Sequence, residues 1–132
     1  MATVLTTVGK GIVTGRMIGG ASPSQAEPKF VAIGSGAGTA AVGDTTLFTE
    51  YTNGTWSGYA RTSNAGTQTT ISVTNDTVQW TGTFTAPASE TVTNAGNFDA
   101  STVGNLCVHG DFTGVALNTN DSLQITIQIQ FT

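Results

Sequence analysis

Two short stretches contain residue types that could do chemistry. The first, "IGSGAGTAA", spaces Gly34, Gly36 and Gly38 one residue apart after an apolar run. Such a loop could cradle a phosphate if a helix followed it and turned free backbone N–H groups toward the anion, and a P-loop would add a Lys-Ser/Thr pair. The "TAAVGDTT" that follows contains no lysine and no helix signal. We therefore interpret the glycines as a turn or bulge with positive φ angles.

The second stretch, "LCVHGDF", contains His109 and Asp111 in a chain rich in Ser and Thr, which superficially permits a hydrolytic triad. On one strand these two side chains would point side by side, and the chain has no G-x-S-x-G elbow to present a nucleophile. A single histidine is also weak for metal binding. We therefore expect no enzyme activity, no metal and no cofactor, and we interpret His109 as a polar residue on an outer face or at a subunit contact.

Composition limits the remaining possibilities. The 132 residues fit one domain, and only 9% of them are charged. Residues 1–29 contain three basic residues and one acidic residue, whereas residues 30–132 contain one basic and seven acidic residues. So few basic residues cannot neutralise a phosphate backbone, so we expect neither nucleic acid nor a membrane as a partner. The lone Cys107 excludes an internal disulfide and is expected to be a small semi-buried residue.

The elements that must position these residues are short strands. The final "SLQITIQIQFT" alternates apolar and polar residues from Leu123 to Phe131, which predicts one strand with one buried face. The segment "TTISVTNDTVQWTGTF" predicts a hairpin that turns at Asn75-Asp76, with Ile71 and Val73 on the apolar face of its first strand. Further strands are expected over 30–33, over 59–63, from residue 92 to a turn at residue 99, and over 106–112, where a glycine at 110 suggests a bulge or a close backbone approach.

No window shows helical spacing with a cap, and β-branched residues are frequent throughout. The chain is therefore expected to be all-β: a single antiparallel β-sandwich or jelly-roll domain over residues 26–132, preceded by an extended N-terminal arm over residues 1–25. No apolar run approaches the roughly 20 residues of a membrane span, and the first 20 residues lack a signal peptide's apolar centre, which predicts a soluble protein without the usual export signal.

Residues 37–56 are expected to form a long exposed loop. The end of this loop overlaps the stretch "EYTNGTWSGYA", residues 50–60, in which Tyr51, Trp56 and Tyr59 cluster among small polar residues. Exposed aromatic side chains of this kind could stack on a sugar or insert into a partner protein. Packing of the three rings against the loop's own sheet is an equally good interpretation.

Three longer segments carry turn and strand signatures: "KFVAIGSGAGTAAVGDTTLFTE" followed by Arg61, then "TVTNAGNFDASTVGNLCVHGDF" and "LNTNDSLQITIQIQFT". In this order they resemble a group of small structural proteins of tailed bacteriophages. In that group a G-x-G…T-x-L…E segment is followed by an Arg, by a TNAGLFDA…GNLLVKGDF-type stretch and by a final strand. The resemblance extends from about Val13 to Thr132, and none of its motifs is catalytic.

Related patterns occur in proteins that decorate or cement phage heads and in the N-terminal domains of tail-fibre proteins. Tail-fibre members usually continue into long fibrous regions, whereas this sequence ends at Phe131-Thr132 as its last strand closes, which favours a head protein. The resemblance therefore implies a capsid decoration protein, made in the host cytoplasm and located on the capsid surface of the virion. Its partners would be the major capsid protein and other copies of itself, as a homotrimer or another small oligomer.

This hypothesis assigns the contact with an acidic shell to the basic N-terminal segment. The segment from Val4 to Met17 is the expected contact arm. The candidate contact residues are Val4, Leu5, Lys10, Ile12, Val13, Arg16, Met17 and Lys29.

The alternative hypothesis is a tail- or fibre-associated virion protein involved in attachment. In that case the loop with Tyr51, Trp56 and Tyr59 would bind a host glycan or an adjoining fibre protein. An enzyme acting on cell-wall sugar would need two carboxylates facing each other across a cleft, and nothing in the sequence pairs its glutamates.

Overall fold

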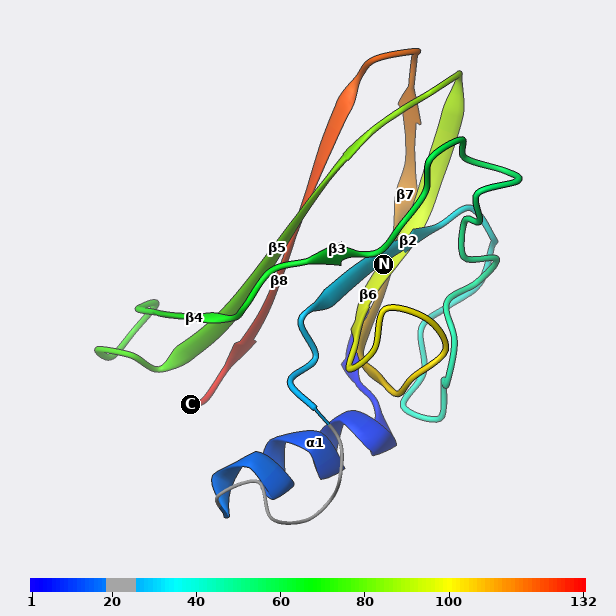
Figure 1. The fold of residues 1–132 in the computed structure, drawn as a ribbon. Coiled ribbons are helices and arrows are strands. Elements are labelled where there is room, and N and C mark those ends of the chain that lie inside the picture. The colour runs from blue at the N-terminus through cyan, green and yellow to red at the C-terminus, as the bar shows by residue number, and fades with distance from the viewer. Residues whose placement is uncertain (19–25) are drawn as a thin grey trace.

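The alternation near the end of the chain forms the longest regular ladder of the structure. We describe residues 1–18 and 26–132 of a computed structural model (Figure 1). Strand β8 (Ser122–Gln130) pairs antiparallel with β5 (Thr77–Thr85) along its whole length, and β4 (Thr67–Thr69) adds to the other side of β5. The odd-numbered apolar residues of β8 are buried or half-buried and Gln124, Thr126 and Gln128 are exposed, which confirms the expected alternation. Phe131 lies beyond the strand and is exposed.

The predicted hairpin exists, but its first strand is earlier and its turn is longer than expected. Ile71 and Val73 are not on an apolar strand face: they lie in a bend and are exposed. Asp76 accounts for this difference, because its carboxylate accepts hydrogen bonds from the backbone N–H groups of residues 71, 72 and 73. These bonds give the backbone of the loop an alternative to ladder pairing.

The second sheet has five strands in the order β1-β7-β6-β2-β3, and neighbours are antiparallel. Its strands are β1 (Thr3–Leu5), β2 (Phe30–Gly34), β3 (Thr62–Ser63), β6 (Glu90–Phe98) and β7 (Leu106–Leu117). The expected strands at 30–33, 92–99 and 106–112 are confirmed. The strand expected at 59–63 is reduced to its last two residues. Gly110 lies close to β1, and a Cβ there would be 3.1 Å from the Thr3 hydroxyl oxygen.

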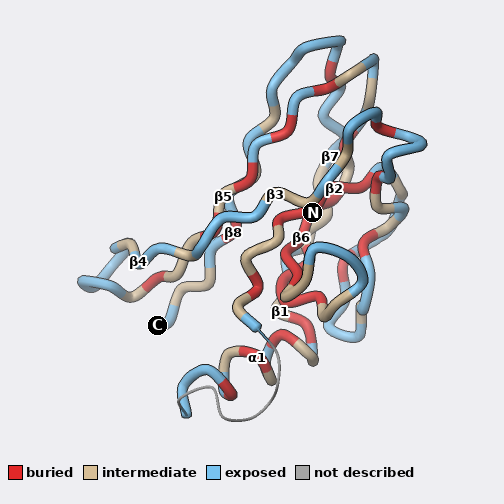
Figure 2. Tube along the Cα trace, in the orientation of Figure 1, coloured by how far each residue is buried: buried red, intermediate tan, exposed pale blue. Residues whose placement is uncertain are grey.

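The two sheets form the expected all-β sandwich, with the main core between them (Figure 2). Trp80, Phe84 and Ile127 of the three-stranded sheet face Val31 and Ile33 of the other. The five-stranded sheet is also buried on its far side, where a second apolar cluster forms. That cluster consists of Ala32, Leu47, Phe98 and Leu106, with Phe30 packed against it.

The N-terminal segment is not an extended arm. Residues 3–5 form β1, and Thr7–Met17 form helix α1, which the sequence did not predict because three glycines and several β-branched residues lower its helix propensity. Thr6 caps the helix, since its hydroxyl accepts a hydrogen bond from Gly9 N–H. Gly9 packs directly on the backbone of Cys107 and Ile12 enters the main core. Tertiary packing therefore stabilises a helix of low intrinsic propensity. The remainder of the expected arm, residues 19–25, lies outside the described residues.

The long loop after β2 is irregular as expected, but it is not fully exposed. Leu47, Tyr51 and Trp56 are each about 5% exposed or less. The glycines at its start do not have positive φ angles. They permit a close approach instead: a Cβ at Gly34 or Gly36 would lie within 2.8 Å of the Phe48 backbone. The loop can therefore lie on the sheet only because these positions lack side chains.

Candidate functional sites

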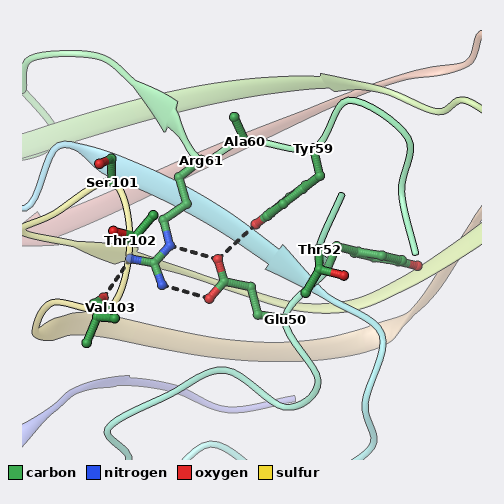
Figure 3. A pocket seen from close by; sticks show the side chains of 9 residues that line it. Glu50, Thr52, Tyr59, Ala60, Arg61, Ser101, Thr102 and Val103 are labelled. Carbon is green, nitrogen blue, oxygen red and sulfur yellow. Dashed lines mark hydrogen bonds and ion pairs between the residues drawn. The ribbon is translucent and has the colours of Figure 1, made fainter. Parts of the chain in front are cut away.

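An ion pair at the edge of the five-stranded sheet connects three loops (Figure 3). The Arg61 Nε and Nη2 atoms donate to the two carboxylate oxygens of Glu50 at 2.7 and 2.8 Å. Its Nη1 donates to the carbonyls of Ala100 and Val103. The guanidinium carbon lies 3.6 Å from the ring centroid of Phe98. Arg61 is thus held by a bidentate pair, two carbonyls and an aromatic face, and its side chain is only 7% exposed.

A hollow of about 410 Å³ lies beside this pair. Hydroxyl groups of Thr52, Ser101 and Thr102 contribute to its wall, and the Tyr59 hydroxyl donates to Glu50 at 3.1 Å. Burial raises the pKa of Tyr59 well above its usual value. The hollow therefore presents neutral hydroxyls around an ion pair that is already satisfied, which suits hydrogen bonding to a polar surface.

A second polar cluster is buried under the long loop. Asn94 donates to the Phe48 carbonyl at 2.9 Å and its side-chain oxygen accepts from Phe48 N–H. His109 is fully buried, with Nδ1 2.7 Å from Asp44 and Nε2 3.3 Å from Asn94. The Ala41 N–H and the His109 ring hold the pKa of Asp44 below its ordinary value. The sequence indicated an outer face or a subunit contact for His109, and the outer-face interpretation is wrong because the side chain is fully buried. His109 instead fastens the loop to β7.

Two more aspartates stabilise turns. Asp111 accepts hydrogen bonds from the N–H groups of Ala40 and Ala2, which lower its pKa. Asp99 accepts from the backbone and side-chain amides of Asn105, so it closes the loop that Arg61 also binds. Cys107 is fully buried, and burial raises the pKa of its thiol to about 12. Within residues 1–18 and 26–132, no three His, Cys, Asp or Glu side chains gather closely enough to hold a metal ion.

Two of the three aromatic residues of the loop belong to the core rather than to a recognition surface. Tyr51 and Trp56 are each 4% exposed and contact each other edge to face. Tyr59 is half-buried and stacks on Phe84. Packing against the loop's own sheet is therefore correct for Tyr51 and Trp56, and of the three only Tyr51 and Tyr59 line the hollow.

The candidate contact residues of the N-terminal segment are divided between interior and surface. Ile12 is 1% exposed and Leu5 packs against the main core. Val4 and Val13 are half-buried. Lys10, Arg16 and Met17 are exposed on α1, whereas the Lys29 ammonium lies 5.8 Å from the Phe30 ring centroid. The exposed side of α1 is thus the part of this segment that is available to a partner. No helix in the described part of the chain combines the length and apolar character needed to cross a membrane.

Comparison with known proteins places these features in a family. The model of a family described as podophage GP4 fiber I protein gp80 matches residues 10–130, nearly the whole chain. The chain belongs to this family. It is a bacteriophage structural protein, as the sequence resemblance implied, and the family description favours the fibre alternative over capsid decoration. No curated protein and no solved structure matches the chain.

In this member of the gp80 family, the residues that carried the sequence resemblance fasten loops. Glu50 is the last residue of its first segment, Arg61 is the arginine that follows that segment, and Asn94 belongs to its "TNAG" stretch. The sequence pattern includes these residues but does not predict their contacts. Glu50 and Arg61 are 11 residues apart, and Phe48 and Asn94 are 46 residues apart. The one available signal was that Arg61 is the sole basic residue after residue 29.

Proposed function

We propose that this protein is a non-enzymatic structural subunit of a podophage tail fibre, or of the site where the fibre joins the tail. The observation that carries the proposal is the family match over residues 10–130. The architecture supports it, because the polar groups that could do chemistry are used to bind loops to the sheet. Arg61 binds Glu50 and two carbonyls, and His109 lies between Asp44 and Asn94.

The location of the protein in the particle tests this proposal. Fab fragments raised against the folded protein, gold-labelled and added to intact phage, are expected to mark the tail or its fibres. Quantitative mass spectrometry of purified particles is expected to give far fewer copies than of the major capsid protein. Label spread over the head, with a copy number near that of the capsid protein, would overturn the fibre proposal in favour of the decoration hypothesis.

We further propose that the exposed face of α1 contacts a neighbouring virion protein. Lys10 and Arg16 are exposed there, in the basic part of an otherwise acidic chain. Deleting the segment would remove β1 and Ile12 from the fold, so a surface charge reversal is the cleaner test. Lys10→Glu with Arg16→Glu is expected to reduce incorporation into particles while the purified variant keeps the thermal stability of the wild type. Full incorporation would exclude this face as the contact.

A second candidate function, host glycan recognition, is favoured by the hollow beside Arg61. Its wall combines threonine and serine residues with Tyr51 and Tyr59, whose polar groups can hydrogen-bond to a sugar. Thr102→Trp would fill the hollow while leaving Glu50 and Arg61 unsubstituted, and Thr113→Trp places the same ring on the exposed part of β7. If glycan-array binding exists and only Thr102→Trp abolishes it, recognition at this hollow is supported. Equal binding by both variants would contradict it.

A further inference from the structure

One of the four sheet edges lacks the usual protection against pairing with other chains. Natural sheets keep edges short or place charges and prolines on them. Strands β1, β3 and β4, at three of the four sheet edges, have three, two and three residues. Strand β8, at the fourth, has nine residues, and the segment Ser122–Gln130 contains no charged residue and no proline. Among the four described strands at the ends of the sheet orders, β8 is therefore the one long strand without these protective features.

Hydrogen bonds at the ends of β8 show which of its backbone groups are unpaired. Phe131 N–H donates to the Asp76 carbonyl, and the Asp121 carbonyl accepts from Ala86 N–H, so the odd-numbered residues turn their backbone groups toward β5. In an antiparallel ladder the backbone groups of the alternate residues point the other way. The N–H and C=O groups of the even-numbered residues, with Thr126 in the middle, therefore point outward along a free edge.

The sequence of β8 is complementary to itself about Thr126. A second β8 that lies antiparallel, with Thr126 opposite Thr126, would align like with like. The partners in that register would be Leu123 with Ile129, Ile125 with Ile127, Gln124 with Gln128, and Ser122 with Gln130. Apolar residues would continue the inner face and amides the outer face. Because Thr126 is one of the residues with outward backbone groups, the pair at the centre would be of the hydrogen-bonded kind.

The inner side of this edge also has apolar surface left to cover. A groove of about 230 Å³ lies between β8 and the β1–β7 edge of the other sheet. Phe112 and Ile125 line it and are only half-buried. A strand added to β8 would extend the three-stranded sheet along this groove, with its half-buried Ile125 on the side of the apolar wall. No charge on either strand opposes the contact.

We propose that β8 is a two-fold contact between two copies of this chain, formed by antiparallel pairing of β8 with β8 and centred on Thr126. The self-complementary register, the lack of charge and the outward backbone groups all fit a second copy of the same chain. Two-fold contacts of this kind use the same surface on both subunits. The contact goes beyond the proposed fibre function, and it would join two trimers if a threefold contact exists elsewhere on the surface.

Charge substitutions at the centre of the register test the proposal on the purified full-length chain. Sedimentation equilibrium is expected to show an even-numbered assembly for the wild type. Thr126→Lys and Thr126→Glu each place two like charges directly opposite one another, so each variant alone is expected to have half the wild-type mass. An equimolar mixture of the two variants is expected to recover the wild-type mass, because every contact then joins Lys to Glu.

A matched control separates this contact from a general effect of charge. Thr67→Lys adds the same charge to the opposite edge of the same sheet, where Thr67 is exposed on β4, and it should leave the wild-type mass unchanged. Circular dichroism verifies that every variant is folded. A wild-type monomer, or a wild-type assembly whose mass Thr126→Lys does not change, would overturn the β8 contact. Either result leaves the location experiment for the fibre function unaffected.

Discussion

The two sheets of this protein are stabilised in different ways. The five-stranded sheet has a main core on one face and a second cluster on the other, and buried polar side chains bind irregular loops to it. The three-stranded sheet is a regular ladder whose inner residues are mostly apolar and whose outer residues, apart from Thr77, are exposed or half-buried Thr and Gln. Its one fully buried polar side chain among the described residues is Thr77.

This difference indicates that the two sheets of one small domain have different roles. Buried polar groups require partners in a fixed geometry, so the five-stranded sheet specifies one arrangement of its loops at the cost of burying Arg61, Asn94 and His109. An alternating strand requires only that one face be covered, so β8 can keep a free, neutral edge for a neighbour.

The largest effect is expected at the ion pair. Arg61→Ala should lower the free energy of unfolding by about 3 kcal/mol, because it leaves the Glu50 carboxylate without its partner and releases the loop carbonyls. This figure is at the low end for a buried pair, since the Glu50 side chain is 23% exposed. Arg61→Lys should recover little, because an ammonium cannot replace the bidentate geometry. Urea unfolding measures both variants, and Arg16→Ala on the exposed helix surface is the control.

A smaller loss is expected where α1 packs on β7. Gly9→Ala should cost about 2 kcal/mol, because its Cβ would collide with the Cys107 backbone, which cannot move aside as a side chain can. Gly11 lies in the same helix with no atom within 4 Å of its Cβ position. Gly11→Ala should therefore raise the stability by about 0.5 kcal/mol through helix propensity. Thermal melts of the two variants that shift in the same direction would contradict this packing.

A pH-dependent effect is expected at the β4–β5 turn. Hydrogen bonds from the N–H groups of Ile71, Val73 and Ser72 lower the pKa of Asp76 in the folded state. A lowered folded-state pKa means that the carboxylate stabilises the fold above its unfolded pKa of about 4 and loses this effect as the pH falls through the folded value. Asp76→Asn should thus lower the melting temperature at pH 7, and the difference from wild type should shrink toward pH 2. A difference that is constant with pH would rule out this role.

The smallest effect is expected on the outer face of the three-stranded sheet. Gln128 donates a side-chain hydrogen bond to Gln79 at 2.7 Å between exposed amides. Gln79→Ala should change the free energy of unfolding by no more than about 0.5 kcal/mol, because water replaces the lost bond. Chemical denaturation measures this change. A loss as large as that of Arg61→Ala would mean that the two sheets do not differ as described.

Period-two patterns and turn residues predicted most strands of the sandwich correctly. They placed β2, β6, β7 and β8 because each is long enough, or apolar enough, for side-chain alternation to be visible in sequence. They missed α1, since Gly9, Gly11 and Gly15 hide a helix that forms only where Gly9 and Ile12 can pack. They also missed the hairpin loop, in which Asp76 binds three backbone N–H groups of the bend that contains Ile71 and Val73.

The candidate sites were harder to predict. Tyr51 and Trp56 stand in a polar, glycine-rich stretch, and nothing local shows that the loop folds back to bury them. His109 alternates correctly with its neighbours, yet both faces of β7 are covered at that point, so the outward face is buried as well. Asp44 and Asn94 become its partners only through contacts across 65 and 15 residues.

Local patterns are sufficient to predict the all-β class, the alternation of β8 and the resemblance to phage structural proteins, because each depends on neighbouring residues or on the order of motifs. The tertiary structure alone decided that Glu50 meets Arg61, that His109 is buried and that the N-terminal segment is a capped helix against β7. These features depend on contacts between distant residues. Their free energy comes from long-range packing and from hydrogen bonds that offset the cost of desolvating the polar groups, and no local pattern in the sequence records either contribution.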